Sequence, residues 1–216
     1  HKNIASELQL FVYDDKTLAE YEAFKLIHLD KFLVDDKVNW LNIHGLNNVE
    51  WLQAIGDYFS IDNFMLADIL NTVRRTKLEE TNDCLFFNIK SLLPESNGID
   101  VEQISFILRD GLLFSFQEKK SDFFLHIRER MRQHAGIVRD RKVDYLLYLL
   151  LDAVMENFYI TIESEEQKID SLIDLIKSTP NPNILEDIEL HRDNLNFLRR
   201  SIVPLRDSLY SIKSMK

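Results

Sequence analysis

The stretch from Val143 to Lys216, which opens with VDYLLYLLLDAVMENF and closes with LRRSIVPLRDSLYSIKSMK, decides the fold of this chain. Apolar residues recur at helical spacing on both sides of the turn-forming sequence TPNPN at 179–183, which predicts two long helices. In the second helix, apolar residues and one histidine alternate in steps of three and four: Ile188, His191, Leu195, Leu198, Ile202, Leu205, Leu209 and Ile212. Such a heptad seam is typical of a helix that packs along its length against partner helices.

The first of these helices carries one broad apolar stripe, made of Val143, Leu147, Leu150, Val154, Phe158, Ile162, Ile169, Ile173 and Ile176. Each helix would reach roughly 50 Å, since an α-helix rises about 1.5 Å per residue. A compact domain of this length is only about 35 Å across, so we expect the helix pair to project. The alternative is a helical hairpin inside an ordinary core. Pro204 lies within the seam and predicts a bend near 202–205 rather than a helix end.

The part of the chain before residue 141 shows strand and helix patterns by turns. Alternating apolar residues predict strands at 7–13, 37–43, 84–92, 101–109 and 112–117, and helical spacing predicts helices at 48–58, 63–72 and 122–133. Candidate helix caps are Asn47 or Asn48, Ser60 or Asp62, and Ser121 or Asp122. Residues 16–36 fit either an amphipathic helix or a pair of short strands.

The order of these elements predicts an α/β (α+β) fold. Residues 1–140 are expected to form a mixed β-sheet sandwiched by helices. Residues 141–216 are expected to form a long projecting helical hairpin and the start of a stalk helix.

Charge is unevenly placed along the chain, whose net charge is −10. Residues 152–189 hold ten acids and two bases, whereas residues 190–216 hold six bases and two acids. The acidic tip argues against nucleic acid as a partner, because nucleic acid requires a basic surface. The acids fit either a solvated helix face or a surface that attracts divalent cations.

Sequence motifs for common catalytic and cofactor chemistry are missing. The five glycines are isolated, which excludes a glycine-rich phosphate loop, and the six histidines lack the spacing of a zinc site. We expect no enzymatic activity and no organic cofactor, since no nucleophile is placed beside a base. Cys84 is expected mid-strand as a small buried residue, and His191 either as a polar residue that fixes helix register or as a half-exposed core histidine. No uncharged apolar run is long enough to span a bilayer, and no signal peptide is expected.

The chain carries several short motifs in a fixed order. They are FMLADILN at 64–71 with RTKLE at 75–79, LFSFQE at 113–118, RERMR at 128–132, DYLLY at 144–148 with Asp152, and RSIVPLRD at 200–207. In this order they resemble the CorA family of magnesium and cobalt channels, from about residue 38 to the end. Val203 stands where that family commonly has an aromatic residue.

The resemblance implies a cytoplasmic ion-sensing domain of a transporter for divalent cations, with Mg²⁺ or Co²⁺ as the regulatory or transported ion. It implies a pentamer of identical subunits at the cytoplasmic face of the cell membrane. The membrane-spanning segment and a Gly-Met-Asn pore motif would follow beyond Lys216. In the family, Mg²⁺ bound between neighbouring cytoplasmic domains holds the pore shut.

Three residues are candidate metal ligands through this resemblance. Asp68 falls on the family's interface aspartate, although Ala67 replaces the usual acidic neighbour. Asp152 falls on another family acid, and Glu156 lies one turn further along. Mg²⁺ suits such a site because it keeps several waters and takes one or two carboxylates. Without the resemblance, Asp68 would be an ordinary exposed helix acid. Two alternatives stay open: a zinc-transporting relative of the same fold, and a scaffold whose helical hairpin docks a protein partner without any ion.

Overall fold

The computed structural model describes residues 6–22, 24–72, 75–81, 83–96, 98–120, 123–178 and 183–214. Its centre is one mixed seven-stranded sheet with the order β2-β1-β3-β7-β6-β5-β4. The strands are β1 (Glu7–Tyr13), β2 (Leu18–Glu22), β3 (Val38–His44), β4 (Lys77–Glu80), β5 (Leu85–Glu95), β6 (Gly98–Arg109) and β7 (Leu112–Gln117). β3 and β7 pair in parallel, and the other neighbouring strands pair antiparallel.

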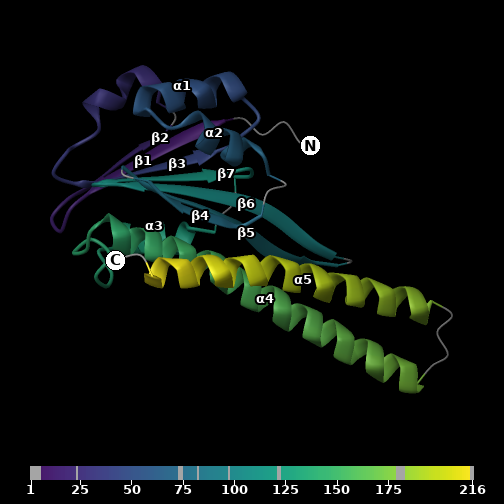
Figure 1. The fold of residues 1–216 in the computed structure, drawn as a ribbon. Helices are drawn as coiled ribbons and strands as arrows, with labels where there is room; N and C mark the ends of the chain where they lie inside the picture. Colours follow the sequence, from purple (N-terminus) through teal and green to yellow (C-terminus); the bar gives the residue numbers. More distant parts are fainter. Residues whose placement is uncertain are drawn as a thin grey trace.

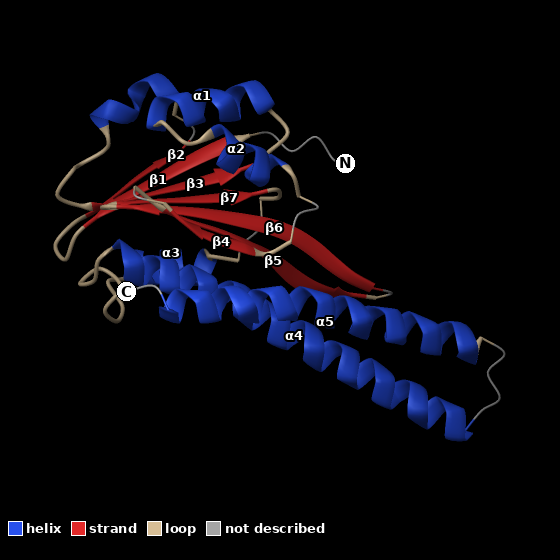
Figure 2. Ribbon diagram, viewed as in Figure 1, coloured by secondary structure: helices blue, strands red, loops and turns tan. Residues whose placement is uncertain are grey.

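Helices cover both faces of this sheet (Figure 1, Figure 2). They are η1 (Leu26–Lys31), α1 (Val49–Phe59), α2 (Asn63–Leu70), α3 (Leu125–Arg132), α4 (Val143–Ser178) and α5 (Ile184–Ser214). α1 and α2 lie over one face, whereas α3, α4 and α5 lie over the other. The far ends of α4 and α5 extend past the edge of the sheet. The predicted fold class, a mixed sheet between helices followed by a long projecting hairpin, is confirmed.

The two faces of the sheet build two separate hydrophobic cores because successive strand residues point to opposite sides. On β3, Trp40 belongs to the core under α4, and its neighbour Leu41 belongs to the core under α1 and α2. Both side chains are fully buried. The first core is completed by apolar residues of α4: Val143, Leu146, Leu147, Leu149, Leu150, Ala153, Val154 and Phe158.

The apolar stripe of α4 is buried only where the helix crosses the sheet. Phe158 is 5% exposed, but Ile162, Ile173 and Ile176 further along are each about 40% exposed. By length and composition alone, Val143–Lys177 would qualify as a membrane span, with a mean hydropathy of 1.3. Half of its apolar window is buried inside the protein, however, as in a core helix. The burial therefore explains the high hydropathy of α4.

The heptad seam of α5 is likewise buried in part. Leu198 and Leu205 are buried, whereas Ile188 and Leu195 are nearly half exposed. The seam positions Leu209 and Ile212 lie outside the described side chains. α5 continues through Pro204, so the prediction that this proline does not end the helix is confirmed. The turn at 179–182 lies outside the described residues.

Several element boundaries differ from the sequence-based prediction. Within 16–36, the described residues form the strand β2 and the 3₁₀ helix η1, which is neither of the two predicted arrangements. β5 runs through Pro94, which pairs with Ile99 rather than ending the strand. Cys84 is buried as predicted, but it lies just before β5 instead of mid-strand. α2 ends at Leu70.

The predicted helix caps are found at two of the three helices. The side chains of Asn48 and Asp62 accept hydrogen bonds from the first turns of α1 and α2. At α3 the candidates Ser121 and Asp122 lie outside the described residues, and the N-cap is Phe124. The division of the chain at residue 140 stays a prediction.

Candidate functional site

Asp68 is placed by the short helix α2, which packs on the face of the sheet opposite α4. Its side chain is buried, with a relative exposure of 5%. The expectation of an exposed helix acid from the sequence alone is therefore wrong. The cause is the docking of α2, which buries Met65, Leu66 and Ile69 and carries Asp68 inward with them. The exposed neighbour is Ala67, where the resemblance expects an acid.

Lys77, at the start of β4, neutralises this buried carboxylate. Its Nζ lies 3.0 Å from Oδ2 of Asp68 and 2.6 Å from Oε2 of Glu79. The hydrogen bond to Glu79, and then the contact with Asp68, raise the pKa of Lys77 above its usual value. The ammonium therefore stays protonated between the two carboxylates and supplies a cation to Asp68.

Asp68 and Lys77 line an open depression of about 720 Å³ between α2 and the edge of the sheet. Four acids line it, Asp62, Asp68, Glu79 and Asp83, with two bases, Lys77 and Arg109. Arg109 donates hydrogen bonds to the carbonyl oxygens of Phe59 and Ser60 at the end of α1. Of the two bases that line the depression in the described part of the chain, Lys77 is the one that forms ion pairs with two of its carboxylates, Asp68 and Glu79.

Asp152 and Glu156 lie one turn apart on α4 and are placed differently from Asp68. Both acids are exposed. Both line a shallow depression of about 450 Å³ together with His126 of α3 and Asn157. Asn157 is fixed by donating a hydrogen bond to Ser91 of β5, 2.9 Å away. The structure therefore brings Asp152 and Glu156 together with an imidazole nearby.

The sheet separates the two candidate sites. Asp68 belongs to the α2 face, and Asp152 and Glu156 belong to the α4 face. Among the described residues, no group of three or more His, Cys, Asp or Glu side chains could hold a metal ion. A Mg²⁺ ion at either place would therefore need water or oxygens from another chain, as Mg²⁺ commonly does.

Sequence reasoning missed a third cluster, which lies on the hairpin. Glu165 of α4 is fully buried and accepts from Lys168, from Asn194 and from His191 Nδ1, which is 3.0 Å away. Burial raises its pKa, but these hydrogen bonds together lower the pKa below the usual value. The signal in the sequence was His191, whose place on an apolar seam indicated a polar partner on the other helix. The cluster fastens α4 to α5.

Comparison with known proteins identifies the family. A family described as "CorA-like Mg2+ transporter protein" matches residues 35–216. The chain belongs to this family. It is 31% identical over 208 residues to the cobalt/magnesium transport protein CorA of Thermotoga maritima, covering 95% of this chain and 59% of that relative. The chain thus spans about three-fifths of the length of this curated CorA relative.

Several solved structures share the fold. The soluble domain of CorA from Methanocaldococcus jannaschii superposes with a TM-score of 0.73 at 17% identity, covering 93% of this chain and 77% of that one. The ZntB cytoplasmic domain from Vibrio parahaemolyticus superposes with a TM-score of 0.71 at 13% identity, covering 97% and 80%. These similarities confirm the seven-stranded sheet with its long helices as the architecture of a CorA soluble domain.

Proposed function

We propose that the chain is the cytoplasmic ion-sensing part of a CorA-type transporter of divalent cations, with Mg²⁺ as the sensed ion and Co²⁺ as a second substrate. Membership of the family supports transport, and the T. maritima relative is named for cobalt and magnesium. In this proposal identical subunits form a pentamer, and a segment beyond Lys216 anchors it in the membrane.

The observation that carries the proposal is the buried carboxylate of Asp68 with its ion-pair partner, Lys77. A carboxylate held inside a protein needs a compensating cation. Here that cation is on a side chain that is 43% exposed and already shared with Glu79. A divalent ion could replace the ammonium at Asp68 while Lys77 kept its pairing with Glu79.

In this proposal, association of the subunits depends on the charges of carboxylates that face each other across the interface. When Asp68 of one chain faces a carboxylate of the next, two such charges about 5 Å apart repel by roughly 3 kcal/mol at an effective dielectric near 20. A Mg²⁺ ion between them reverses the sign of this interaction. Loss of the ion would therefore loosen the interface and release the pore. Asp152 and Glu156 are proposed as a second, independent site on the α4 face.

Calorimetry with Mg²⁺, Co²⁺ and Zn²⁺ tests the proposal. We expect Mg²⁺ binding in about the millimolar range, because Ala67 replaces an acid and a single chain offers few charged oxygens. Asp68→Asn should abolish Mg²⁺ binding at the site on the α2 face, and Asp152→Asn with Glu156→Gln should abolish Mg²⁺ binding at the site on the α4 face. The matched control is Asp170→Asn, an exposed acid of α4.

Three results would reject parts of this proposal. Unchanged Mg²⁺ binding in the variant that lacks all three acids would reject the site assignment. A clear preference for Zn²⁺ would favour the zinc-transporting alternative. Absence of binding by any of the three ions would favour the protein-docking scaffold.

A further inference from the structure

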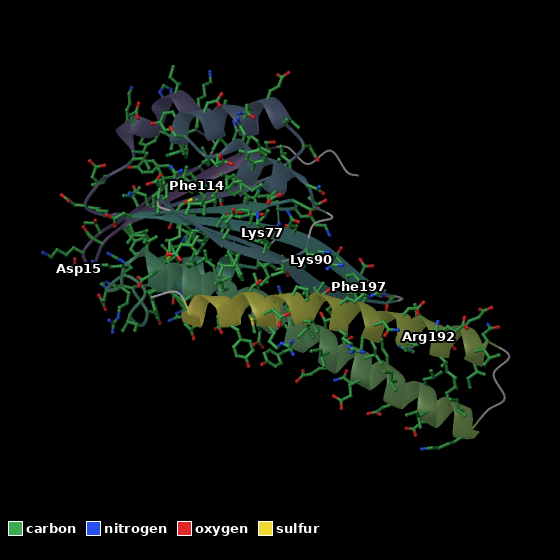
Figure 3. All side chains as sticks on the ribbon, viewed as in Figure 1. Asp15, Lys77, Lys90, Phe114, Arg192 and Phe197 are labelled. Carbon is green, nitrogen blue, oxygen red and sulfur yellow. The ribbon has the colours of Figure 1, made fainter. Side chains whose placement is uncertain are left out.

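A groove between α5 and the β4 edge of the sheet is lined by several basic side chains. It has a volume of about 910 Å³ and is lined by four basic side chains, two from the sheet side (Arg75 and Lys90) and two from α5 (Arg199 and Arg200). Figure 3 labels two of its lining residues, Lys90 on the sheet and Phe197 on α5. We call it the basic groove.

Two of these charges come from neighbouring segments of the sheet. Lys77 at the start of β4 pairs with Asn88 of β5, and Arg75 and Lys90 each lie two residues beyond this pair and line the groove. Like charges close together on neighbouring strands are destabilising. Arg199 and Arg200 add two further charges from the facing helix. Four cations around one space favour a bound anion.

The basic groove carries more positive than negative charge, although Lys90 interacts electrostatically with Glu118, which is not among its lining residues. Among the described residues, no acidic side chain lines the basic groove, and none of its four basic side chains forms an ion pair with a carboxylate. Basic side chains elsewhere commonly do: Lys119 pairs with Asp100, and Arg132 with Glu20. The groove is therefore an electropositive site on a chain whose net charge is −10.

We propose that the basic groove binds the polyphosphate group of a small soluble molecule. Guanidinium groups bind phosphate oxygens in a bidentate manner, and an ammonium adds a point charge beside them. The volume falls in the range of small-molecule sites. The partly buried ring of Phe197 and the side chain of Thr76 also line the groove and can contact the rest of such a molecule.

The source of the phosphates is inferred from charge on the whole chain. A protein with ten excess negative charges, eight of them from residues 152–189, is repelled by an anionic lipid surface or a nucleic-acid backbone. A small anion can enter the groove without approaching the acidic hairpin. We therefore assign the site to a free phosphorylated ligand. This assignment does not depend on the metal sites proposed above.

Inorganic tripolyphosphate is a direct probe for the groove. We expect calorimetry of the 216-residue chain to show saturable binding that weakens with salt. Arg75→Ala with Arg199→Ala should weaken it by about tenfold or more, since both guanidinium groups would contact phosphate. Both residues are exposed, so the variant should retain the wild-type melting temperature.

The control is Lys25→Ala with Lys31→Ala, which removes the same charge from exposed residues outside the groove. Binding should change less than about twofold in this variant. Equal weakening in both variants would show a non-specific charge effect and overturn the proposal, as would no binding by the wild-type chain. In the last experiment, binding of the chain to phosphatidylglycerol vesicles is measured. Binding to vesicles without binding of tripolyphosphate would overturn the assignment to a soluble ligand.

Discussion

At the scale of single residues, Lys77 holds the place that a metal ion would take beside Asp68. Lys77→Met should lower the free energy of unfolding by about 1–2 kcal/mol in metal-free buffer, because the buried carboxylate of Asp68 loses its ion pair with Lys77. This cost is smaller than that of breaking a fully buried ion pair, since Lys77 is 43% exposed. Added Mg²⁺ should raise the melting temperature of this variant more than that of the wild type. Lys77→Met combined with Asp68→Asn should remove that extra response. An equal Mg²⁺ response in all three proteins would contradict the role of Lys77.

Glu102, on β6, gives the fold a distinct pH dependence. Its carboxylate is buried and accepts a hydrogen bond from the backbone N–H of Lys119 at 2.9 Å. Burial raises its pKa from 4.5 to about 7. The unfolded chain releases this proton near pH 4.5, whereas the folded chain keeps it until about pH 7, so stability is lost as the pH rises through this window.

Glu102→Gln isolates this effect. The neutral amide should raise the free energy of unfolding by about 2 kcal/mol at pH 8 and by almost nothing at pH 4, where the wild-type side chain is also neutral. Urea unfolding across pH 4–8 measures it, with the exposed Glu189→Gln as the control. A stability difference that stays constant with pH would refute the assignment.

At the scale of elements, Gly56 sets how closely α1 approaches α2. A Cβ at this position would lie 2.2 Å from Cδ1 of Leu66, which is itself buried. Gly56→Ala should therefore destabilise the fold by about 1–2 kcal/mol, even though alanine favours helix. Gly98→Ala is the matched control, because nothing lies within 4 Å of its Cβ position. The melting temperatures of both variants, measured by thermal unfolding, test this prediction. A higher melting temperature for Gly56→Ala would contradict it and show that Leu66 repacks freely.

At the scale of the whole molecule, the hairpin leaves apolar side chains uncovered. Leu185 is 72% exposed and Leu195 is 48% exposed, so this surface offers some attraction between chains. The acidic residues 152–189 oppose such contact. We expect the 216-residue chain to be a monomer or a weak, concentration-dependent oligomer in analytical ultracentrifugation. A stable pentamer formed without metal would be inconsistent with this balance.

The overall architecture could be predicted because it depends on periodic patterns. The strands β1, β3 and β7 follow plain alternation, and α4 and α5 follow a helical repeat. Alternation did not predict β4, because its four residues, KLEE, show almost none; only the resemblance of RTKLE at 75–79 to a family strand indicated it. The pairing of Asp68 with Lys77 was also missed, since it depends on how α2 docks against the strand. Tertiary docking of this kind leaves no periodic signal in the sequence.

The single parallel ladder in the sheet has a consequence for how the chain folds. It joins two antiparallel halves, β2-β1-β3 and β7-β6-β5-β4, each built from pairings nearer in sequence. Trp40 on β3 donates to Ser115 on β7 across a loop of 75 residues. Closing so long a loop is slow, so the junction of the halves should limit the refolding rate.

Ser115→Ala should then slow refolding while changing the unfolding rate little, because the Trp40 bond forms at the rate-limiting step. Stopped-flow measurements of tryptophan fluorescence would detect the change directly. If the variant refolded at the wild-type rate but unfolded faster, the pairing of β3 with β7 would form after the folding transition state, and the prediction would be wrong. In the expected order, the two halves of the sheet form first, and the chain becomes native only when β3 meets β7.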